Sequence, residues 1–337
     1  HPCRFTSMTN PLVSVITPSF NQADFLEDTI QSVLGQDYPE IEYIIVDGGS
    51  TDGSVEIIKK YQSKLAWWVS EPDEGQASAI NKGMAKARGE IVAWLNSDDL
   101  YLPGAVSEAV AASRSNPQAN LIFGNAITID AEGFPLKELI FPDWGLEDLT
   151  GFRIICQPAV FMRRDAFQGV NGLNPNSHFM LDHQLWIRIA CLGQITHEDS
   201  FWAAARHHGA AKNVSHAAAF GRETLEVLDW MEQQDVLGPV VMKNHRKVQA
   251  GAFRLNARYL LDGGQYQAAL ISYGRAFINQ PLYTARHWHR ILYAGLGLIG
   301  VKDLDRLYSR YQNSRRPDLS FMEDFRGWPG LRIELSE

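Results

Sequence analysis

The chain has 337 residues, enough for one large domain or a domain with an appendage, and 45% of them are hydrophobic, which is sufficient for a real core. A formal net charge of −8 argues against a nucleic-acid-binding protein, because such a protein needs a basic surface. Cys3, Cys156 and Cys191 are too few and too scattered for a disulfide framework or a zinc site, which favours a reducing compartment.

The first ten residues are set apart from the fold. The stretch "HPCRFTS" before Met8 is interpreted as a cloning remnant, so residues 1–10 are expected to be a tag or disordered. We see no signal peptide and no run near the roughly 18 apolar residues of a membrane span. We therefore expect a cytoplasmic protein that touches a membrane, if at all, from its inner face.

Strand and helix patterns alternate over residues 11–129. The apolar runs "LVSVITPSF", "IEYIIVDGG", "LAWWVS", "GEIVAWL" and "ANLIFGNAI" read as strands. Between them, "FLEDTIQSVLGQ", "VEIIKKYQ", "QASAINKGMAKA" and "GAVSEAVAASRS" have helical spacing. This alternation predicts βαβ units in a mostly parallel sheet with helices on both faces, and it places the C-terminal strand ends at one edge, where ligands usually bind.

The rest of the chain divides into two parts. Residues 130–220 are richer in Gly, Pro and Asn around one clear helix, "DHQLWIRIACLG", and we expect them to face a second substrate. Residues 221–337 are largely helical, and 247–281 have the spacing of one tetratricopeptide-like hairpin. The plainer alternative is a pair of amphipathic helices packed on the first domain, because stable solenoids need several repeats.

Two adjacent carboxylates follow the strand pattern in "AWLNSDDLYLP". Asp98 or Asp99 is a good N-cap for a helix beginning near Leu100 or Pro103, and this structural interpretation accounts for one acid. Two neighbouring carboxylates repel each other, however, and a divalent cation offsets that repulsion best. Oxygen ligands of this kind suit Mg²⁺ or Mn²⁺ together with substrate phosphates.

Two of three further acids have both a structural and a functional interpretation. In "VDGGSTDGS", Asp52 is expected to cap the helix that starts near Ser54, whereas Asp47 ends a strand and is equally suited to a ligand contact. Asp182 opens the helix "DHQLWIRIACLG". The positive end of the helix dipole stabilises an acid at this position, which is the structural interpretation. The functional interpretation is that Asp182 acts as a general base.

These motifs occur in one order, "VSVITPSFNQAD…VDGGSTDGS…SEPDEGQASAINKGM…GEIVAWLNSDD…QPAVFMRRDAF…LDHQLWIRIA". The order resembles the family 2 glycosyltransferases with the GT-A fold, over residues 11 to about 214. That fold is Rossmann-like, with a mixed, mostly parallel sheet flanked by helices, and here we expect it to carry a C-terminal helical extension. The resemblance implies a nucleotide-binding half at 11–129, an acceptor half at 130–220, and inverting transfer from a nucleotide-diphosphate sugar, with a UDP-sugar favoured. The expected acceptor is a saccharide or glycolipid hydroxyl in polysaccharide or glycoconjugate synthesis.

The resemblance also assigns roles to residues of this sequence. The nucleotide-sugar contacts that it implies are Pro18, Ser19, Phe20, Asp47, Asp73, Gly75, Ser97, Asp98 and Lys212. The motif after the second strand usually has a second acid, which is Gly48 here, and Asp73 could compensate for it. The metal motif has lost its first acid, to Asn96 or Ser97.

For a Mn²⁺ or Mg²⁺ ion, the resemblance implies Asp99 as leading ligand, Asp98 as second ligand and His208 completing the shell. It implies Asp182 as general base. Trp186 could stack on an acceptor sugar, although its helical spacing favours a place in the core.

Two other classes of protein could have this sequence pattern. A catalytically silent binding protein would keep the fold and recruit a protein partner through its C-terminal helices, and the substituted acidic motifs favour it. A nucleotidyltransferase is disfavoured because "TPSFNQAD" contains neither Gly nor a basic residue. The segment "RHWHRILYAGLGLIG" could lie on a membrane surface, although an ordinary docking helix explains it too.

Overall fold

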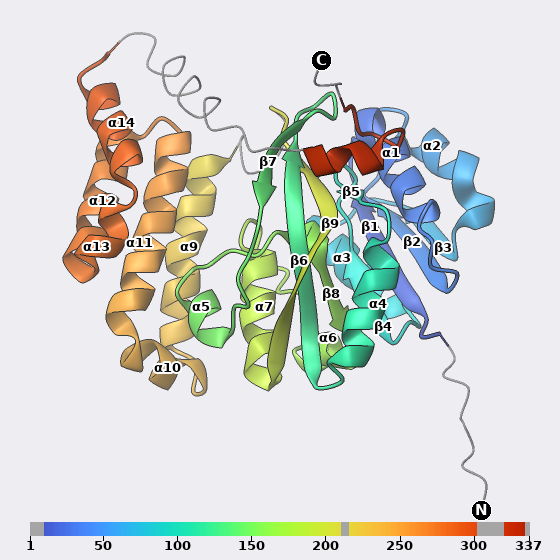
Figure 1. Cartoon of the computed structure of the whole chain (residues 1–337), viewed down its shortest axis with the longest axis horizontal. Helices are drawn as coiled ribbons and strands as arrows, with labels where there is room; N and C mark the ends of the chain where they lie inside the picture. Colours follow the sequence, from blue (N-terminus) through green and yellow to red (C-terminus); the bar gives the residue numbers. More distant parts are fainter. Residues whose placement is uncertain (1–9, 210–215, 302–319, 334–337) are drawn as a thin grey trace, which may run out of the picture.

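The computed structural model describes residues 10–209, 216–301 and 320–333. In this part of the chain a mixed sheet of nine strands is flanked by helices (Figure 1). The strands are β1 (Val13–Ser19), β2 (Ile41–Asp47), β3 (Trp67–Ser70), β4 (Ile91–Trp94), β5 (Leu100–Tyr101), β6 (Ala119–Ile129), β7 (Pro135–Leu139), β8 (Val160–Arg163) and β9 (Gln194–Arg206).

Helices follow most of the strands and then form the C-terminal part of the chain. The α-helices are α1 (Ala23–Leu34), α2 (Ser54–Tyr61), α3 (Gln76–Lys86), α4 (Ala105–Ser115), α5 (Leu146–Thr150), α6 (Arg164–Gly169), α7 (Leu181–Leu192), α9 (Ala217–Glu232), α10 (Leu237–Lys243), α11 (His245–Asp262), α12 (Tyr266–Asn279), α13 (Pro281–Ala285) and α14 (Trp288–Leu298). The 3-10 helices are η1 (Gln62–Lys64), η2 (Gln157–Ala159) and η3 (Ser320–Phe325).

The strand order across the sheet is β3-β2-β1-β4-β8-β6-β9-β5, and β7 pairs with β6. The first four strands are parallel, as predicted, because helices connect them. Beyond β4 the pairing is mixed: β8 is antiparallel to both β4 and β6, whereas β9 is parallel to β6. The expectation of a mostly parallel sheet therefore applies only to the N-terminal half. There, Ser19 pairs with Asp47, so the ends of β1 and β2 meet at one edge.

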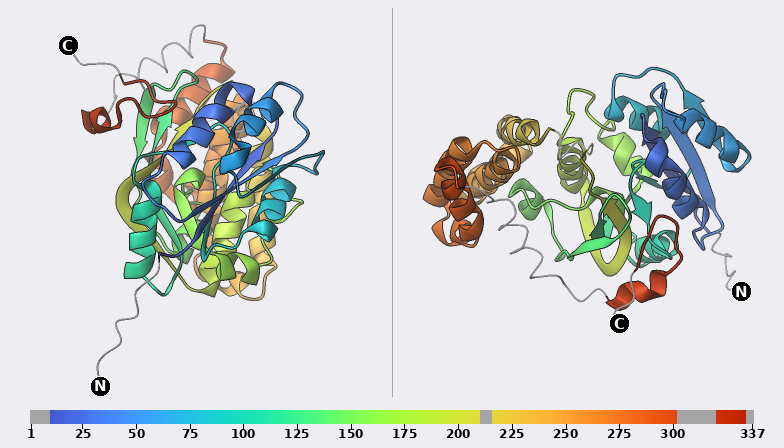
Figure 2. Two further views of the ribbon diagram at one scale, coloured as in Figure 1. Left: turned by 90° about the vertical axis from the view of Figure 1, so that its right-hand side faces the viewer. Right: turned by 90° about the horizontal axis from the view of Figure 1, so that it is seen from above.

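The sheet separates two hydrophobic cores. Alternate residues of β2 point to opposite faces, so that Tyr43 and Ile45 pack towards α1, α2 and α4, whereas Ile44 and Val46 pack towards α3 and α7. Helix α1 buries Leu26, among others, on the face that its apolar spacing predicted. Figure 2 shows the same arrangement from two further sides, with helices on both faces of the sheet.

The C-terminal helices pack on the core that also contains α7. Buried residues of α9 and α11, among them Leu228 and Leu255, belong to this core. The approach is closest at Gly251, where an added Cβ would lie 2.1 Å from the carbonyl oxygen of Gly151. Helices α11 and α12 form a hairpin in the segment where one was expected, and the expected boundary at residue 220 falls inside α9.

The last described segment returns to the sheet rather than continuing the helical region. Phe321 stacks on Phe201 of β9 with ring centroids 4.6 Å apart. The indole Nε1 of Trp328 donates a hydrogen bond of 2.7 Å to the carbonyl oxygen of Tyr101 in β5. The end of the described chain therefore covers β5 and β9 (Figure 1), which the sequence did not indicate.

The Gly251 contact predicts a sharp difference between two glycine substitutions. Gly251→Ala must push α11 away from Gly151, and overpacking of this kind costs about 1–3 kcal/mol. Gly274→Ala in α12 meets nothing within 4 Å and should instead stabilise the helix by up to about 1 kcal/mol. Urea unfolding followed by circular dichroism measures both changes. Equal midpoints for the two variants would show that the close approach does not constrain the fold.

Candidate active site

A cavity of about 840 Å³ opens at the C-terminal ends of β1 and β4. The first residues of α3 and α7 line it, together with residues of α9 and α11. Most of the predicted site residues border this one space, namely Pro18, Ser19, Phe20, Asp73, Gly75, Ser97, Asp98, Asp99 and Asp182. The edge of the parallel strands thus carries the residues that the sequence pattern placed there.

The acidic turn after β4 leads into another strand, so it does not cap a helix. The amide N–H of Asp99 donates to the carbonyl oxygen of Asn96, which closes the turn, and β5 follows at once. Helix α4 begins only at Ala105 and has Gly104 at its N-cap. The N-cap interpretation of Asp98 or Asp99 is therefore wrong.

The two neighbouring acids have different surroundings. The Oδ2 atom of Asp98 lies 3.0 Å from Nε2 of His208. Asp99 is only 6% exposed, and its two carboxylate oxygens accept hydrogen bonds from the Arg206 backbone N–H and the Asn96 amide. Burial, together with the charge of Asp98, raises the pKa of Asp99. Asp99 is thus held by the protein itself, whereas Asp98 stands beside a histidine.

Arg206, at the end of β9, holds this turn by hydrogen bonds, and no motif of the sequence indicated that role. Besides its backbone bond to Asp99, its Nε donates to the carbonyl oxygen of Asp98 at 3.0 Å. A second guanidinium nitrogen donates to the carbonyl oxygen of Ala131 at 2.9 Å. The position depends on β9 lying beside β5, a long-range pairing that no local motif reports.

Asn96 is one of the two residues, with Ser97, that could replace the first acid of the family's metal motif. Its side chain connects the turn to α3 and to η2. Its Oδ1 accepts a hydrogen bond of 2.8 Å from Gln76 of α3. Its Nδ2 donates to Oε1 of Gln157 at 3.1 Å, and the Nε2 of Gln157 donates to the carbonyl oxygen of Trp94 at 2.8 Å. An uncharged amide therefore connects the turn to both neighbours without adding a third carboxylate.

Asp182 lies half-buried in the first turn of α7 and faces the cavity. Its Oδ1 accepts a hydrogen bond of 2.7 Å from the backbone N–H of His183. Burial raises the pKa of this carboxyl to about 6, because leaving water disfavours the charged form. A carboxylate that ionises near neutrality at a cavity wall is suited to accept a proton.

Glu223 of α9 holds the loop that leads into α7. The backbone N–H groups of His178, Phe179 and Met180 each donate to its carboxylate at 3.0 Å, and the Ser177 hydroxyl donates to it as well. The side chain is buried. Four donors on one carboxylate fix the backbone immediately before Asp182. No sequence motif indicates this role, since Glu223 is one of several acids along an amphipathic helix.

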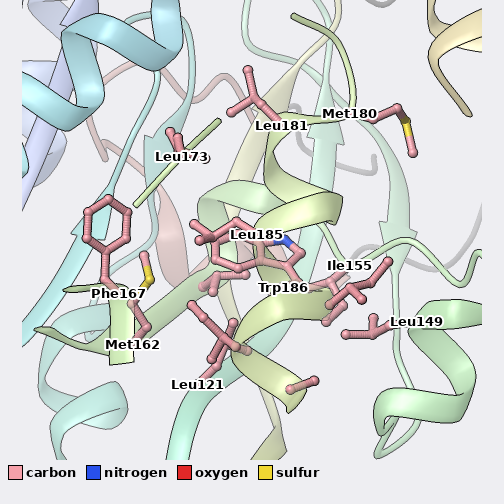
Figure 3. Close-up of a cluster of buried hydrophobic side chains, with 14 of the residues drawn as sticks. Leu121, Leu149, Ile155, Met162, Phe167, Leu173, Met180, Leu181, Leu185 and Trp186 are labelled. Atoms are coloured by element: carbon pink, nitrogen blue, oxygen red, sulfur yellow. The ribbon is translucent and has the colours of Figure 1, made fainter. Parts of the chain in front are cut away.

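Trp186 does not face the cavity, so its predicted acceptor contact is corrected. Its side chain is 0% exposed and stacks on Trp94 with centroids 5.1 Å apart. Figure 3 shows it within the apolar cluster around α7, next to Leu185. The aromatic wall of the cavity is made instead by Phe179, Phe220 and Tyr259. Phe220 lies 5.0 Å from each of the other two rings.

Asp47 also lies outside the cavity lining. It is fully buried, and its Oδ2 accepts hydrogen bonds from the Gly49 and Ser50 N–H groups and from the Ser70 hydroxyl. It therefore shapes the Gly-rich turn, and Gly48 borders the cavity in its place. Asp52 accepts hydrogen bonds from the backbone N–H groups of Ala23 and Ser54, which are the first residues of α1 and α2. Lys212 lies outside the described residues.

The described residues contain no group of three His, Cys, Asp or Glu side chains able to hold a metal ion by themselves. Asp98 and His208 nevertheless bring a carboxylate oxygen and an imidazole nitrogen together, and both are ordinary metal ligands. A Mg²⁺ or Mn²⁺ site commonly uses one or two carboxylates and leaves the remaining positions to water and phosphate. The donor set therefore fits an ion that is completed by its substrate.

Comparison with known proteins identifies the family of this chain. The family "Glycosyl transferase family 2" matches residues 14–189, more than half of the chain. The chain belongs to glycosyl transferase family 2. A putative teichuronic acid biosynthesis glycosyltransferase, TuaG of Bacillus subtilis, is 48% identical over 99 residues, which cover 28% of this chain and 39% of that protein. An uncharacterised glycosyltransferase of Nostoc is 31% identical over 61% of this chain and 68% of its own length.

Solved structures show the same fold at low sequence identity. TarS of S. aureus in complex with UDP-GlcNAc aligns with a TM-score of 0.55 at 17% identity, covering 89% of this chain and 92% of that chain. The mannosyltransferase PcManGT of Pyrobaculum calidifontis, in complex with GDP-Man and Mn²⁺, aligns with a TM-score of 0.58 at 19% identity over 90% and 85%. The predicted GT-A fold, a mixed sheet flanked by helices with a helical C-terminal region, is confirmed.

The match to the curated relatives is partial. This chain spans only 36% to 44% of the length of the first curated relatives that it matches. Within the described residues, no helix combines the length and the apolar character needed to cross a bilayer.

The Glu223 contacts predict a local effect of Glu223→Gln. The amide has one acceptor oxygen instead of two, so the three backbone donors lose part of a charge-assisted arrangement worth about 1.5–3 kcal/mol per bond. Hydrogen exchange should accelerate at residues 178–180, and the free energy of unfolding should fall. Glu226→Gln, at an exposed position of the same helix, is the matched control and should change neither. Unchanged exchange in Glu223→Gln would contradict the role.

Proposed function

We propose that this chain is an inverting glycosyltransferase that moves a sugar from a nucleotide-diphosphate sugar to a hydroxyl group of a saccharide or glycolipid. The observation that carries the proposal is the placing of Asp182, with its raised pKa, and of the Ser97-Asp98 turn around one cavity. Membership of glycosyl transferase family 2 supports the same reaction. The proposal assigns the sugar donor to one side of the cavity and the acceptor to the other.

The donor belongs on the side of the strand ends. Pro18, Ser19 and Phe20 continue β1 into the cavity, and Asp73 and Gly75 border it before α3. We favour a UDP-sugar, in line with the UDP-GlcNAc complex of TarS, although PcManGT is described with GDP-Man. Phe20 is 61% exposed and offers a ring face on which a nucleobase could stack.

Asp98 and His208 would hold the divalent ion, with Asp99 supporting the turn rather than leading the coordination. This order reverses the one that the resemblance implied, because Asp99 already accepts hydrogen bonds on both oxygens. When bound, Mn²⁺ or Mg²⁺ would supply positive charge to the diphosphate leaving group. Asp98 and His208 would then orient the donor so that its anomeric carbon faces Asp182.

Asp182 acts as the general base. Its carboxylate takes the proton of the acceptor hydroxyl while that oxygen forms a bond to the anomeric carbon, and the bond to the diphosphate oxygen breaks with its electron pair leaving on the diphosphate. Attack from the side opposite the leaving group inverts the anomeric centre. Glu223 keeps the loop before Asp182 in place, so the base is positioned before the substrates arrive.

The acceptor belongs beside the aromatic wall. Phe179, Phe220 and Tyr259 border the same cavity as Asp182, and aromatic faces suit the apolar faces of sugar rings. Polysaccharide or glycoconjugate synthesis is the proposed setting. The teichuronic acid biosynthesis named for the Bacillus relative supports it.

The first test addresses the base. Asp182→Asn should lower kcat about 10²- to 10⁴-fold and leave donor affinity nearly unchanged, because only proton transfer is lost. In the parent, kcat should be flat above pH 6 and fall about tenfold per pH unit below it, since the base must be ionised and its pKa is about 6. Asp229→Asn, at an exposed position of α9, is the control. Parental turnover by Asp182→Asn would assign the proton to another group.

The second test addresses donor and metal. A bound ligand raises the melting temperature by mass action, so a screen of nucleotide-sugars with and without Mn²⁺ should reveal the donor. Asp98→Asn and His208→Ala should lose the Mn²⁺-dependent part of the shift. Asp99→Asn should melt at a lower temperature yet keep that part. If no nucleotide-sugar shifts the parent, the catalytically silent binding protein becomes the better interpretation.

A further inference from the structure

The three helices α12, α13 and α14 differ in charge from the rest of the chain. Residues 263–301 contain three arginines, Arg275, Arg286 and Arg290, and no aspartate or glutamate, in a protein whose net charge is −8. The nearest acid, Asp262, lies at the end of α11 and pairs with Arg258 and Arg290. Arg275 and Arg286 remain exposed. This end of the molecule is therefore locally basic.

The same helices expose large apolar side chains. Leu282 is 86% exposed, Ile278 81% and Ile299 74%. Ile271, Trp288 and Leu292 are more than half exposed as well. Single exposed apolar residues are ordinary on protein surfaces, whereas a group of them marks an interaction site.

Helical spacing arranges these residues in stripes. On α12, Ile271, Arg275 and Ile278 follow one another at intervals of four and three residues, so they share the face opposite the buried Tyr273 and Ala276. On α14, Trp288, Leu292 and Ile299 also fall on one stripe. The α12 stripe includes Arg275, and Arg286 stands two residues before Trp288 of α14. Apolar residues with arginines nearby are the composition of a helix that lies on a membrane surface.

The packing of the helices keeps this surface together. An added Cβ at Gly297 of α14 would lie 2.6 Å from the ring of Tyr266, so the end of α14 is pressed against the start of α12. The rings of Tyr266 and Tyr293 are also in contact, at 6.1 Å between centroids. Figure 1 shows α12, α13 and α14 at the end of the molecule farthest from β1–β3, and the view from above in Figure 2 agrees.

We propose that the exposed surface of α12, α13 and α14 binds the surface of an anionic membrane. The occupant follows from two properties together: apolar side chains enter the interface between headgroups and acyl chains, and the arginines, without competing acids, meet lipid phosphates. The inference is independent of the proposed function, since donor binding occurs at the other side of α11 and needs no lipid.

Co-sedimentation of the full chain with vesicles tests the inference. Binding should be strong to phosphatidylcholine vesicles that contain phosphatidylglycerol, weak to phosphatidylcholine alone, and reduced by high salt because exposed charges are screened. Arg275→Gln with Arg286→Gln should weaken binding to the anionic vesicles about 25-fold, as each arginine near such a surface contributes about fivefold. Ile278→Ser, Leu282→Ser and Ile299→Ser together should weaken it by at least about tenfold.

A matched control uses exposed apolar residues elsewhere. Val236 and Met242 are 66% and 79% exposed at the ends of α10, and the double variant to serine should bind vesicles like the parent. Melting curves establish that all variants are folded. Equal binding by the parent and the triple variant would overturn the proposal. So would a self-associating parent, detected by sedimentation velocity, whose dimer the triple variant dissociates, because the surface would then serve a second copy of the chain.

Discussion

The arrangement of the site depends on the buried carboxylate of Asp99. Two adjacent acids at a strand end repel each other, and the fold separates them by giving each a different environment. Asp99 accepts hydrogen bonds from Arg206 and Asn96, which holds the turn between β4 and β5. Asp98 is left at the cavity beside His208. Hydrogen bonds within the protein therefore hold the turn through Asp99, and the partly buried Asp98 borders the cavity.

The C-terminal helices belong to the site as well as to the scaffold. Glu223 of α9 fixes the backbone before Asp182, and Phe220 and Tyr259 contribute the aromatic wall of the cavity. Because Gly251 has no side chain, α11 can lie close to Gly151 at the end of α5. Loosening these helices would thus disturb Asp182 and the aromatic wall together, while the ends of β1, β2 and β4 would keep their register. The outer helices α12–α14 extend the same body towards a different surface.

Particular residues show how far the sequence could be interpreted. Alternation of apolar and polar residues placed Ser97, Asp98 and Asp182 at strand and helix ends, and the structure brings them to one cavity. The same patterns could not decide which way a side chain points. Trp186 and Asp47 lie near the site in the sequence pattern yet face inward, where stacking on Trp94 and hydrogen bonds from a turn occupy them.

The sequence by itself determined the family, the alternation of the parallel strands β1–β4 with their helices, and the edge of the sheet that carries the polar residues, because these follow from local periodicity and from motifs in a fixed order. Only the tertiary structure decided that Arg206 braces the acidic turn, that His208 meets Asp98 and that Glu223 supports the loop before Asp182. The reason is physical: each of these contacts joins residues at least about 40 positions apart, so it arises from strand pairing and helix packing rather than from any local pattern.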